Sequence, residues 1–273
     1  MPLQNKYIYV ILNYINYVII YIKILKEKGK LLYMAEEIGK SLISLKKAGK
    51  IYGSVTALRK IDLDIYKGQS VTIFGSNGAG KSTLLKILSM QTRLSSGSLL
   101  YNGVESKKLA DVYRANFGVI SHQPFVYENL SAMENLEFYG SLYNVKNVKE
   151  RAESLLKQLD LYARRNDAVR TYSRGMLQRI SIARALIHSP EIIFLDEPYT
   201  GLDSLAGNKL SNLLKEQLSS NKTIVMVTHD IHTGLDLASQ VIIMKSGNII
   251  FNKPKSEIDE SSFEKLYLEL TDV

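Results

Sequence analysis

The sequence predicts an α/β fold in which helices flank a mixed sheet. From residue 41 onward, short apolar runs alternate with segments whose apolar residues follow helical spacing. A glycine-rich segment at residues 75–83 lies between the apolar runs 71–74 and 84–88, which is typical of a loop joining a buried strand to a helix. Because 45% of the 273 residues are hydrophobic, the chain has enough apolar side chains for a sizeable core.

The expected strands are short apolar runs at residues 42–45, 61–65, 71–74, 98–101, 117–121, 192–195, 223–227, 241–244 and 249–251. Asn102-Gly103 and residues 246–248 are typical of tight turns. Helical spacing recurs between the fifth and sixth of these strands, at residues 132–143, 148–160 and 176–187. These helices predict a subdomain inserted between core strands, at about residues 124–188. The last apolar residues, 263–270, are expected to form one terminal helix.

The segment after the strand at residues 71–74 fits the pattern G-x-x-x-x-G-K-[ST]. Its glycines permit backbone conformations that let successive N–H groups converge on phosphate oxygens at the positive end of a helix. Lys81 adds a charge near the β and γ phosphates, and the Ser82 hydroxyl suits Mg²⁺. The sequence therefore predicts a triphosphate site formed by Gly75, Ser76, Asn77, Gly78, Ala79, Gly80, Lys81, Ser82 and Thr83.

Two carboxylates, Asp196 and Glu197, directly follow the apolar run at residues 192–195. Both are expected at the carboxyl end of a strand, where open parallel sheets place their ligands. Asp196 is expected to hold the Mg²⁺ shell, and Glu197 to polarise a water that attacks the γ phosphate. Together with the phosphate loop, this pair predicts a triphosphate-hydrolysing enzyme.

Residues 172–179, Tyr-Ser-Arg-Gly-Met-Leu-Gln-Arg, open the helix expected before that strand. The segment resembles the signature of the ATP-binding-cassette (ABC) family, usually Leu-Ser-Gly-Gly-Gln. Ser173 and Gly175 match this signature, whereas Tyr172, Arg174 and Met176 depart from it. The resemblance implies that Ser173 and Gly175, with the helix N-terminus behind them, contact the γ phosphate bound on an opposite subunit.

The resemblance extends from about residue 42 to the C-terminus and implies further roles. Tyr52 matches the aromatic residue that stacks on adenine. Gln123 matches the glutamine that joins the catalytic core to the helical subdomain and senses Mg²⁺ and γ phosphate. Asp203 lies in a segment that resembles the loop crossing the dimer interface, and His229 matches the switch histidine that touches γ phosphate. The implied fold is a P-loop NTPase (RecA-like) core with an antiparallel β subdomain and a helical signature subdomain.

The same resemblance implies an ATPase with two composite sites, each shared between two subunits. One chain supplies Lys81, Ser82, Gln123, Asp196, Glu197 and His229, and the other supplies Ser173 and Gly175. ATP and Mg²⁺ are the implied cofactors; ATP joins the two chains, and loss of the γ phosphate lets them separate. A homodimer and a heterodimer of ATPase subunits both stay open.

No apolar segment of about twenty residues follows residue 34, so a transport pathway needs an integral membrane permease as partner. The chain is then expected to lie peripherally on the cytoplasmic face of the inner or plasma membrane. Residues 121–124 and 129–139 are similar to bacterial exporter ATPases, including the haem-exporter subunits of cytochrome c biogenesis. Residues 124–130 are the expected docking surface; local packing of the helical subdomain is the alternative interpretation of their apolar side chains.

Two functions outside transport stay open. One is a cassette ATPase acting in DNA repair, chromosome organisation or on the ribosome. Such relatives typically carry two cassettes, a long coiled coil or zinc modules, whereas this sequence contains one phosphate loop, so no nucleic acid is expected as partner. The other is an ATP-dependent assembly scaffold, which would share every motif described above.

The first forty residues differ in composition from the rest. Residues 7–22 are apolar apart from Asn13, Asn16 and the tyrosine hydroxyls, which is shorter than the ~20 residues of a membrane span. This stretch is either an interfacial anchor flanked by lysines or the result of a translation start placed too early. Its Ile, Tyr, Asn and Lys content, with a second start available at Met34, favours the interpretation that the start at Met1 is placed too early.

The predicted organisation is an extension at residues 1–40, an ABC ATPase domain at 41–252 and a short tail at 253–273. Most of the excess positive charge, +8 in all, lies in the first fifty residues, which suits a nucleotide, an anionic membrane surface or solubility. The sequence has no cysteine, which excludes disulfides and thiolate metal sites.

Overall fold

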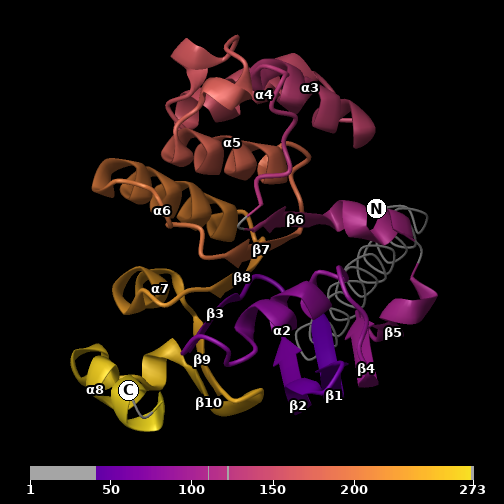
Figure 1. Cartoon of the computed structure of the whole chain (residues 1–273), viewed down its shortest axis with the longest axis vertical. Helices are drawn as coiled ribbons and strands as arrows, with labels where there is room; N and C mark the ends of the chain where they lie inside the picture. Colours follow the sequence, from indigo (N-terminus) through magenta and orange to yellow (C-terminus); the bar gives the residue numbers. More distant parts are fainter. Residues whose placement is uncertain (1–40, 110, 122, 272–273) are drawn as a thin grey trace, which may run out of the picture. The chain divides into compact units, whose positions relative to one another are not determined.

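The computed structural model describes residues 41–109, 111–121 and 123–271. The predictions for residues 1–40 lie outside this part of the chain and stay predictions. Residues 41–273 form one compact unit, with two sheets and helices on their faces (Figure 1). The division at residues 252 and 253 likewise stays a prediction.

The larger sheet has six strands in the order β10-β9-β3-β8-β7-β6. All neighbours are parallel except β10, which pairs antiparallel with β9 at the edge. Its parallel strands are almost continuously apolar because helices cover both faces. The strands are β3 (Ser70–Gly75), β6 (Phe117–Ile120), β7 (Ile192–Asp196), β8 (Thr223–Val227), β9 (Gln240–Lys245) and β10 (Asn248–Pro254).

The smaller sheet is antiparallel, in the order β2-β1-β4-β5. Its strands are β1 (Ile43–Tyr52), β2 (Val55–Ile65), β4 (Ser96–Tyr101) and β5 (Val104–Glu105). Helix α2 (Lys81–Leu88) buries Leu84, Ile87 and Leu88 completely in a cluster that includes residues of both sheets. The helix that begins at the phosphate loop is therefore packed between the two sheets, which holds its N-terminus in place.

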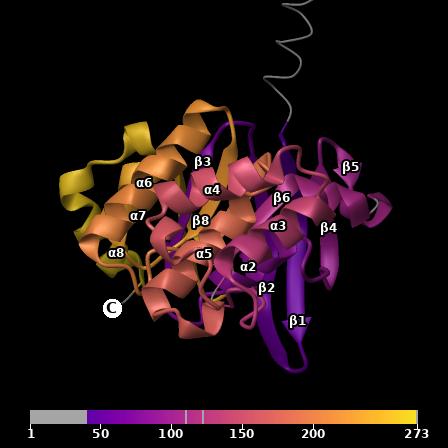
Figure 2. The same cartoon turned by 90° about the horizontal axis from the view of Figure 1, so that it is seen from above.

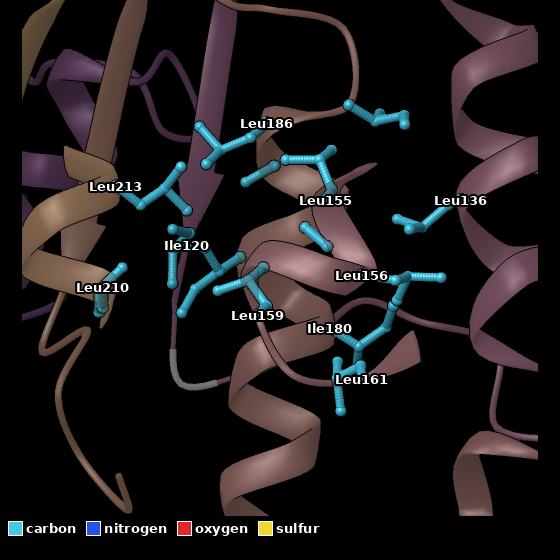
Figure 3. Packing of buried hydrophobic residues seen from close by; sticks show 14 of the residues in the cluster. Ile120, Leu136, Leu155, Leu156, Leu159, Leu161, Ile180, Leu186, Leu210 and Leu213 are labelled. Atoms are coloured by element: carbon cyan, nitrogen blue, oxygen red, sulfur yellow. The ribbon is translucent and has the colours of Figure 1, made fainter. Parts of the chain in front are cut away.

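The helical part consists of α3 (Ala132–Leu142), α4 (Val148–Gln158) and α5 (Arg174–Leu186), which pack on one another. Figure 3 shows their leucines meeting Ile120 of β6 and Leu210 of α6 (Ser204–Ser219) in one apolar cluster. Ser131 and Glu134 form a capping box that begins α3. The cluster joins the helical part to the larger sheet.

Two further helices complete the fold, α7 (Ile231–Leu237) and α8 (Glu260–Thr271). Phe263 of α8 is fully buried, and its ring lies 5.6 Å from that of Phe74 in β3. Seen from above, α6 and α8 lie on the side away from β4 and β5 (Figure 2). Short 3₁₀ helices lie at Ser106–Lys108, Asp111–Asn116, Tyr162–Arg164, Val169–Thr171 and Lys255–Glu257.

The predicted α/β class, with an antiparallel part and a helical part, is confirmed. Local predictions were less complete, since β5, α6 and α7 were not anticipated and β1 and β2 are longer than expected. Strand β1 continues through Lys46, Lys47 and Lys50. The sequence does not show this, because register shifts in the pairing of β1 with β2 and β4 interrupt the regular alternation of apolar and polar residues. The apolar run therefore marks only the buried start of the strand, residues 43–45.

Candidate nucleotide site

The phosphate loop connects β3 to α2, as its sequence predicts. Gly80, the residue before α2, has φ +102°, and a Cβ there would lie 2.6 Å from the carbonyl oxygen of Ala57. At Gly75, with φ +151°, a Cβ would lie 2.4 Å from the carbonyl oxygen of Met244. Side chains at these positions would clash with the backbone of β2 and of β9, so the loop can approach these two strands this closely only with glycine.

Lys81 begins α2 and folds back over the loop. Its Nζ donates to the carbonyl oxygens of Gly75, at 2.7 Å, and of Ser76, at 3.1 Å. The residue is only 8% exposed, and this burial lowers the pKa of its ammonium, although the charges of Glu197 and Asp196 oppose the shift. The ammonium is thus held at the loop with two carboxylates nearby.

Ser82 and Asp196 face each other between α2 and β7. The Ser82 hydroxyl donates to Oδ1 of Asp196 at 3.2 Å, and Asp196 is 5% exposed. A hydroxyl and a carboxylate oxygen at one point fit a hard divalent cation such as Mg²⁺. Within the described residues no group of three or more His, Asp or Glu side chains could hold a metal alone.

Glu197 follows Asp196 at the end of β7 and has φ +51°, a conformation that is strained for a residue with a side chain. Its N–H donates to the carbonyl oxygen of Val227, the last residue of β8, at 2.9 Å. Both carboxylate oxygens are engaged: Thr228 donates its hydroxyl to Oε2 at 3.1 Å, and Nδ1 of His229 lies 2.9 Å from Oε1. The ends of two neighbouring strands thus fix this side chain.

The signature-like segment begins α5. The Ser173 hydroxyl caps the helix by accepting the N–H of Met176 at 3.3 Å. A Cβ on Gly175 would lie 3.0 Å from the carbonyl oxygen of Gly201, so this turn of the helix lies close to the loop before α6. Tyr172 stands where the family usually has leucine, and it is buried with its hydroxyl donating to the carbonyl oxygen of Arg164 at 2.7 Å.

A pocket of about 120 Å³ connects this segment to the carboxylates of the same chain. Asp196 and Glu197 line one side, and Arg174 and Gln178 of α5 line another. Pro124, which directly follows Gln123, completes it together with Leu177 and Thr200. Gln178 donates to the carbonyl oxygen of Pro198 at 2.9 Å, which ties α5 to the loop after the carboxylates.

The remaining predicted site residues lie farther out. Tyr52 is exposed at the end of β1, with the ammonium of Lys50 4.7 Å from the centre of its ring. Gln123 is also exposed, in the segment between β6 and α3. Asp203 caps α6 by accepting the N–H of Ala206 at 2.8 Å. The structure therefore gathers Lys81, Ser82, Asp196, Glu197 and His229, and leaves Tyr52, Gln123 and Asp203 around them.

Three side chains at the site were not predicted from the sequence to lie there: Thr228, Gln178 and Arg174. Thr228 lies between the strand predicted at residues 223–227 and His229, so its position at a strand end was a usable signal. Gln178 and Arg174 lie on the first turns of α5, and only the packing of α5 against residues 197–201 shows that they face the carboxylates.

A glycine loop that opens a helix, a lysine folded over it, a hydroxyl–carboxylate pair and a second carboxylate define a nucleoside-triphosphate hydrolase. Comparisons with known proteins give its family. The sequence model of the ABC transporter family matches residues 58–200. The ABC transporter ATP-binding protein NatA of Bacillus subtilis is 35% identical over 210 residues, which cover 76% of this chain and 85% of NatA. The chain belongs to the ABC transporter family.

Two other similar proteins describe the relationship further. The macrolide export ATP-binding/permease protein MacB of Vibrio parahaemolyticus is 37% identical over 212 residues, which cover 75% of this chain but only 32% of MacB. The dimeric structure of the ATP-binding cassette MJ0796, bound to ADP and Pi, superposes with a TM-score of 0.71 at 30% identity, covering 78% of this chain and 98% of that one. The chain is an ATPase that uses ATP with Mg²⁺.

Proposed function

We propose that this chain is the ATP-hydrolysing subunit of an ABC exporter and that it works as a dimer joined by ATP. The observation that carries the proposal is the set of contacts at the carboxyl ends of the parallel strands. There Lys81 lies over the phosphate loop, Ser82 meets Asp196, and Glu197 meets His229. Among similar proteins, MacB is by its name an export protein, which supports the direction of transport.

Glu197 is the proposed general base. Its carboxylate accepts a proton from a water molecule while the water oxygen bonds to the γ phosphorus. The bond from that phosphorus to the β–γ bridging oxygen breaks, its electrons stay with ADP, and inorganic phosphate is the second product. His229 is proposed to turn from Oε1 of Glu197 towards the γ phosphate, which its exposed side chain allows.

The phosphate loop is proposed to bind the triphosphate through its backbone N–H groups. Residues 75–83 form this cradle, and the Lys81 ammonium exchanges its two carbonyl partners for phosphate oxygens. Ser82 and Asp196, with Gln123, are the proposed protein ligands of Mg²⁺, which would neutralise charge on the phosphates. The exposed ring of Tyr52 is the proposed platform for adenine.

A second copy is proposed to complete each site. The Ser173 hydroxyl and the backbone of Gly175 lie at the N-terminus of α5, the positive end of a helix that suits a phosphate. Asp203 lies in the loop beside them that is proposed to cross the interface. MJ0796, which is similar to this chain, is a dimer.

A membrane permease is the proposed second partner. Phe125 and Tyr127 are exposed in the segment after Gln123, and Phe138 and Leu142 are exposed on α3. The rings of Tyr127 and Phe138 lie 5.1 Å apart, so exposed apolar side chains meet near Gln123, the proposed γ-phosphate sensor, where movement could pass to a partner. None of the helices in the described part of the chain has the length and apolar content to span a bilayer. MacB, by its name, carries ATP-binding and permease functions in one protein.

The proposed location is the cytoplasmic face of the inner or plasma membrane. The narrower prediction, a haem exporter of cytochrome c biogenesis or one for another small hydrophobic cargo, stays a prediction, since cargo is chosen mainly by the permease. Native purification from detergent-solubilised membranes, with identification of the bound partner, tests both points. Recovery of an integral membrane protein supports the exporter; a protein recovered only in soluble assemblies supports the scaffold alternative.

The catalytic part of the proposal is tested with Glu197→Gln. The amide keeps the shape of the side chain but is a far weaker proton acceptor, so turnover is expected to fall by about 10²–10⁴-fold. ATP binding is expected to persist, and size-exclusion chromatography with MgATP should show a trapped dimer. Hydrolysis at the wild-type rate in this variant would refute Glu197 as the base.

A further inference from the structure

Thr228 is a buried hydroxyl that contacts the proposed base. It follows the last residue of β8, is 1% exposed, and has two hydrogen-bond partners. Its Oγ1 lies 3.1 Å from Oε2 of Glu197 and also accepts the backbone N–H of Asp230 at 3.1 Å. Because the Asp230 N–H supplies its own proton, the single hydroxyl proton of Thr228 is directed at the carboxylate.

The two carboxylate oxygens of Glu197 therefore have different partners. Oε2 is bonded to the buried Thr228, whereas Oε1 faces Nδ1 of His229 at 2.9 Å. The His229 side chain is 73% exposed and can leave without unpacking the core, while the Glu197 side chain is 14% exposed. When His229 turns away, Oε1 loses its partner and Oε2 keeps its own.

We propose that Thr228 is a positioning residue for ATP hydrolysis: its hydroxyl holds Oε2 of Glu197, so that Oε1 is the oxygen that meets the attacking water. This inference rests on the proposed role of Glu197 as general base. The terminal torsion of a glutamate is soft, so an unanchored carboxylate would sample many orientations. A displacement of about 1 Å at a reacting group can reduce the rate by about 10²-fold.

A purely structural role predicts different behaviour. The bond from the Asp230 N–H to Thr228 helps to shape the turn before α7, whose first turn Asp230 caps. If this were the whole role of Thr228, its loss would lower stability, and activity would fall only as folded protein is lost. A positioning role instead lowers kcat at unchanged ATP affinity and is lost when Glu197 itself is replaced.

The test compares Thr228→Val with Thr228→Ser. Valine keeps the volume but removes the hydroxyl, and kcat is expected to fall by about 10- to 100-fold with KM for ATP within about twofold. Serine keeps the hydroxyl and should retain kcat within about threefold. Thr72→Val is the matched control, because Thr72 is equally buried in β3 and bonds a backbone carbonyl, that of Gly234 at 3.0 Å. It should change the melting temperature and leave kcat alone.

Adding Thr228→Val to Glu197→Gln should produce no further loss of the residual rate, because the group being positioned is gone. A wild-type kcat in Thr228→Val, a serine variant as impaired as valine, or the same fold-loss in both backgrounds would overturn the inference. The proposed function fails by a different result: normal ATP hydrolysis by Glu197→Gln, whatever rates the Thr228 variants show.

Discussion

The hydroxyl of Ser82 donates a 3.2 Å hydrogen bond to Oδ1 of Asp196, a residue 114 positions later in the chain. Ser82 lies in the first turn of α2, and Asp196 ends β7. The contact brings the phosphate loop and the carboxylate strand to one point. Two oxygen atoms thereby lie together where the proposed Mg²⁺ site needs them, and the packing of α2 between the two sheets holds Ser82 in place.

We expect Ser82→Ala to weaken Mg²⁺ use specifically. Removing one of the three proposed protein ligands should raise the Mg²⁺ concentration that gives half-maximal ATPase activity by about tenfold or more. Chelation with EDTA should abolish hydrolysis in the wild type. The measurement is ATPase rate against free Mg²⁺ at saturating ATP.

Ser89→Ala provides the control for this experiment, because Ser89 lies just after the same helix and bonds the carbonyl oxygen of Leu85 at 2.8 Å. Its Mg²⁺ curve should match that of the wild type. If Ser82→Ala gave the wild-type curve as well, Ser82 would not be a ligand of the metal.

Mixing two inactive variants tests whether sites are shared between chains. Lys81→Ala removes the loop ammonium, and Gly175→Asp places a carboxylate at the N-terminus of α5 beside the Gly201 carbonyl. In a mixed dimer, one composite site carries both changes and the other carries neither. An equimolar mixture is therefore expected to recover about a quarter of wild-type activity, because half of the dimers are mixed and each has one intact site.

Wild type mixed with the double variant Lys81→Ala/Gly175→Asp gives the opposite arrangement, since each site of a mixed dimer then carries one defect. That mixture should show only the activity of its wild-type homodimers. Sites made within one chain would leave the first mixture inactive, and ATPase assays across mixing ratios distinguish the two cases.

His188 is expected to make folding sensitive to acid. Its ring stacks on that of Tyr143, with the ring centres 4.0 Å apart. Burial lowers the pKa of His188 from 6.5 to about 4; the contact of Nε2 with the carbonyl oxygen of Phe117 opposes this shift, and the charges of Arg184 and Lys222 contribute to it. Since the unfolded chain takes up this proton near pH 6.5 and the folded chain only near pH 4, the stabilising contribution is complete above pH 6.5. It is lost as the pH falls between these values.

Urea unfolding from pH 7 to pH 4 measures this effect. From pH 7 to pH 4, the wild type should lose about 2 kcal/mol more unfolding free energy than His188→Phe does. One pKa unit corresponds to about 1.4 kcal/mol, and the figure is reduced because the ring is partly exposed. His232→Gln, at an exposed histidine, should follow the wild type throughout. A gap between wild type and His188→Phe that stays constant with pH would contradict a neutral, buried His188.

The parts of the site that follow one another along the chain could be predicted from the sequence. Gly75 and Gly80 mark a loop whose backbone excludes other residues, and four apolar residues before Asp196 mark a buried strand. Both signals are local, because backbone conformation and burial on two faces restrict residue choice position by position. The helical part was likewise visible in the 3.6-residue spacing of α3, α4 and α5.

Helix α6 and the functional position of Thr228 were not predicted. Asp203 caps α6, whereas the family resemblance implied only that its segment is the loop crossing a dimer interface. The importance of Thr228 depends on Asp196 pairing with Val227 in the parallel register of β7 and β8. Nothing in the local spacing of either strand specifies that register.

The sequence alone predicted a triphosphate site at a strand–loop–helix junction and determined that two carboxylates lie at the end of another strand. Only the tertiary structure decided which groups hold Glu197: the hydroxyl of Thr228 on one oxygen and His229 on the other. The physical reason is that a motif restricts the backbone over a few residues. Strand order and register, in contrast, are set by burial of side chains from the whole sheet and its covering helices.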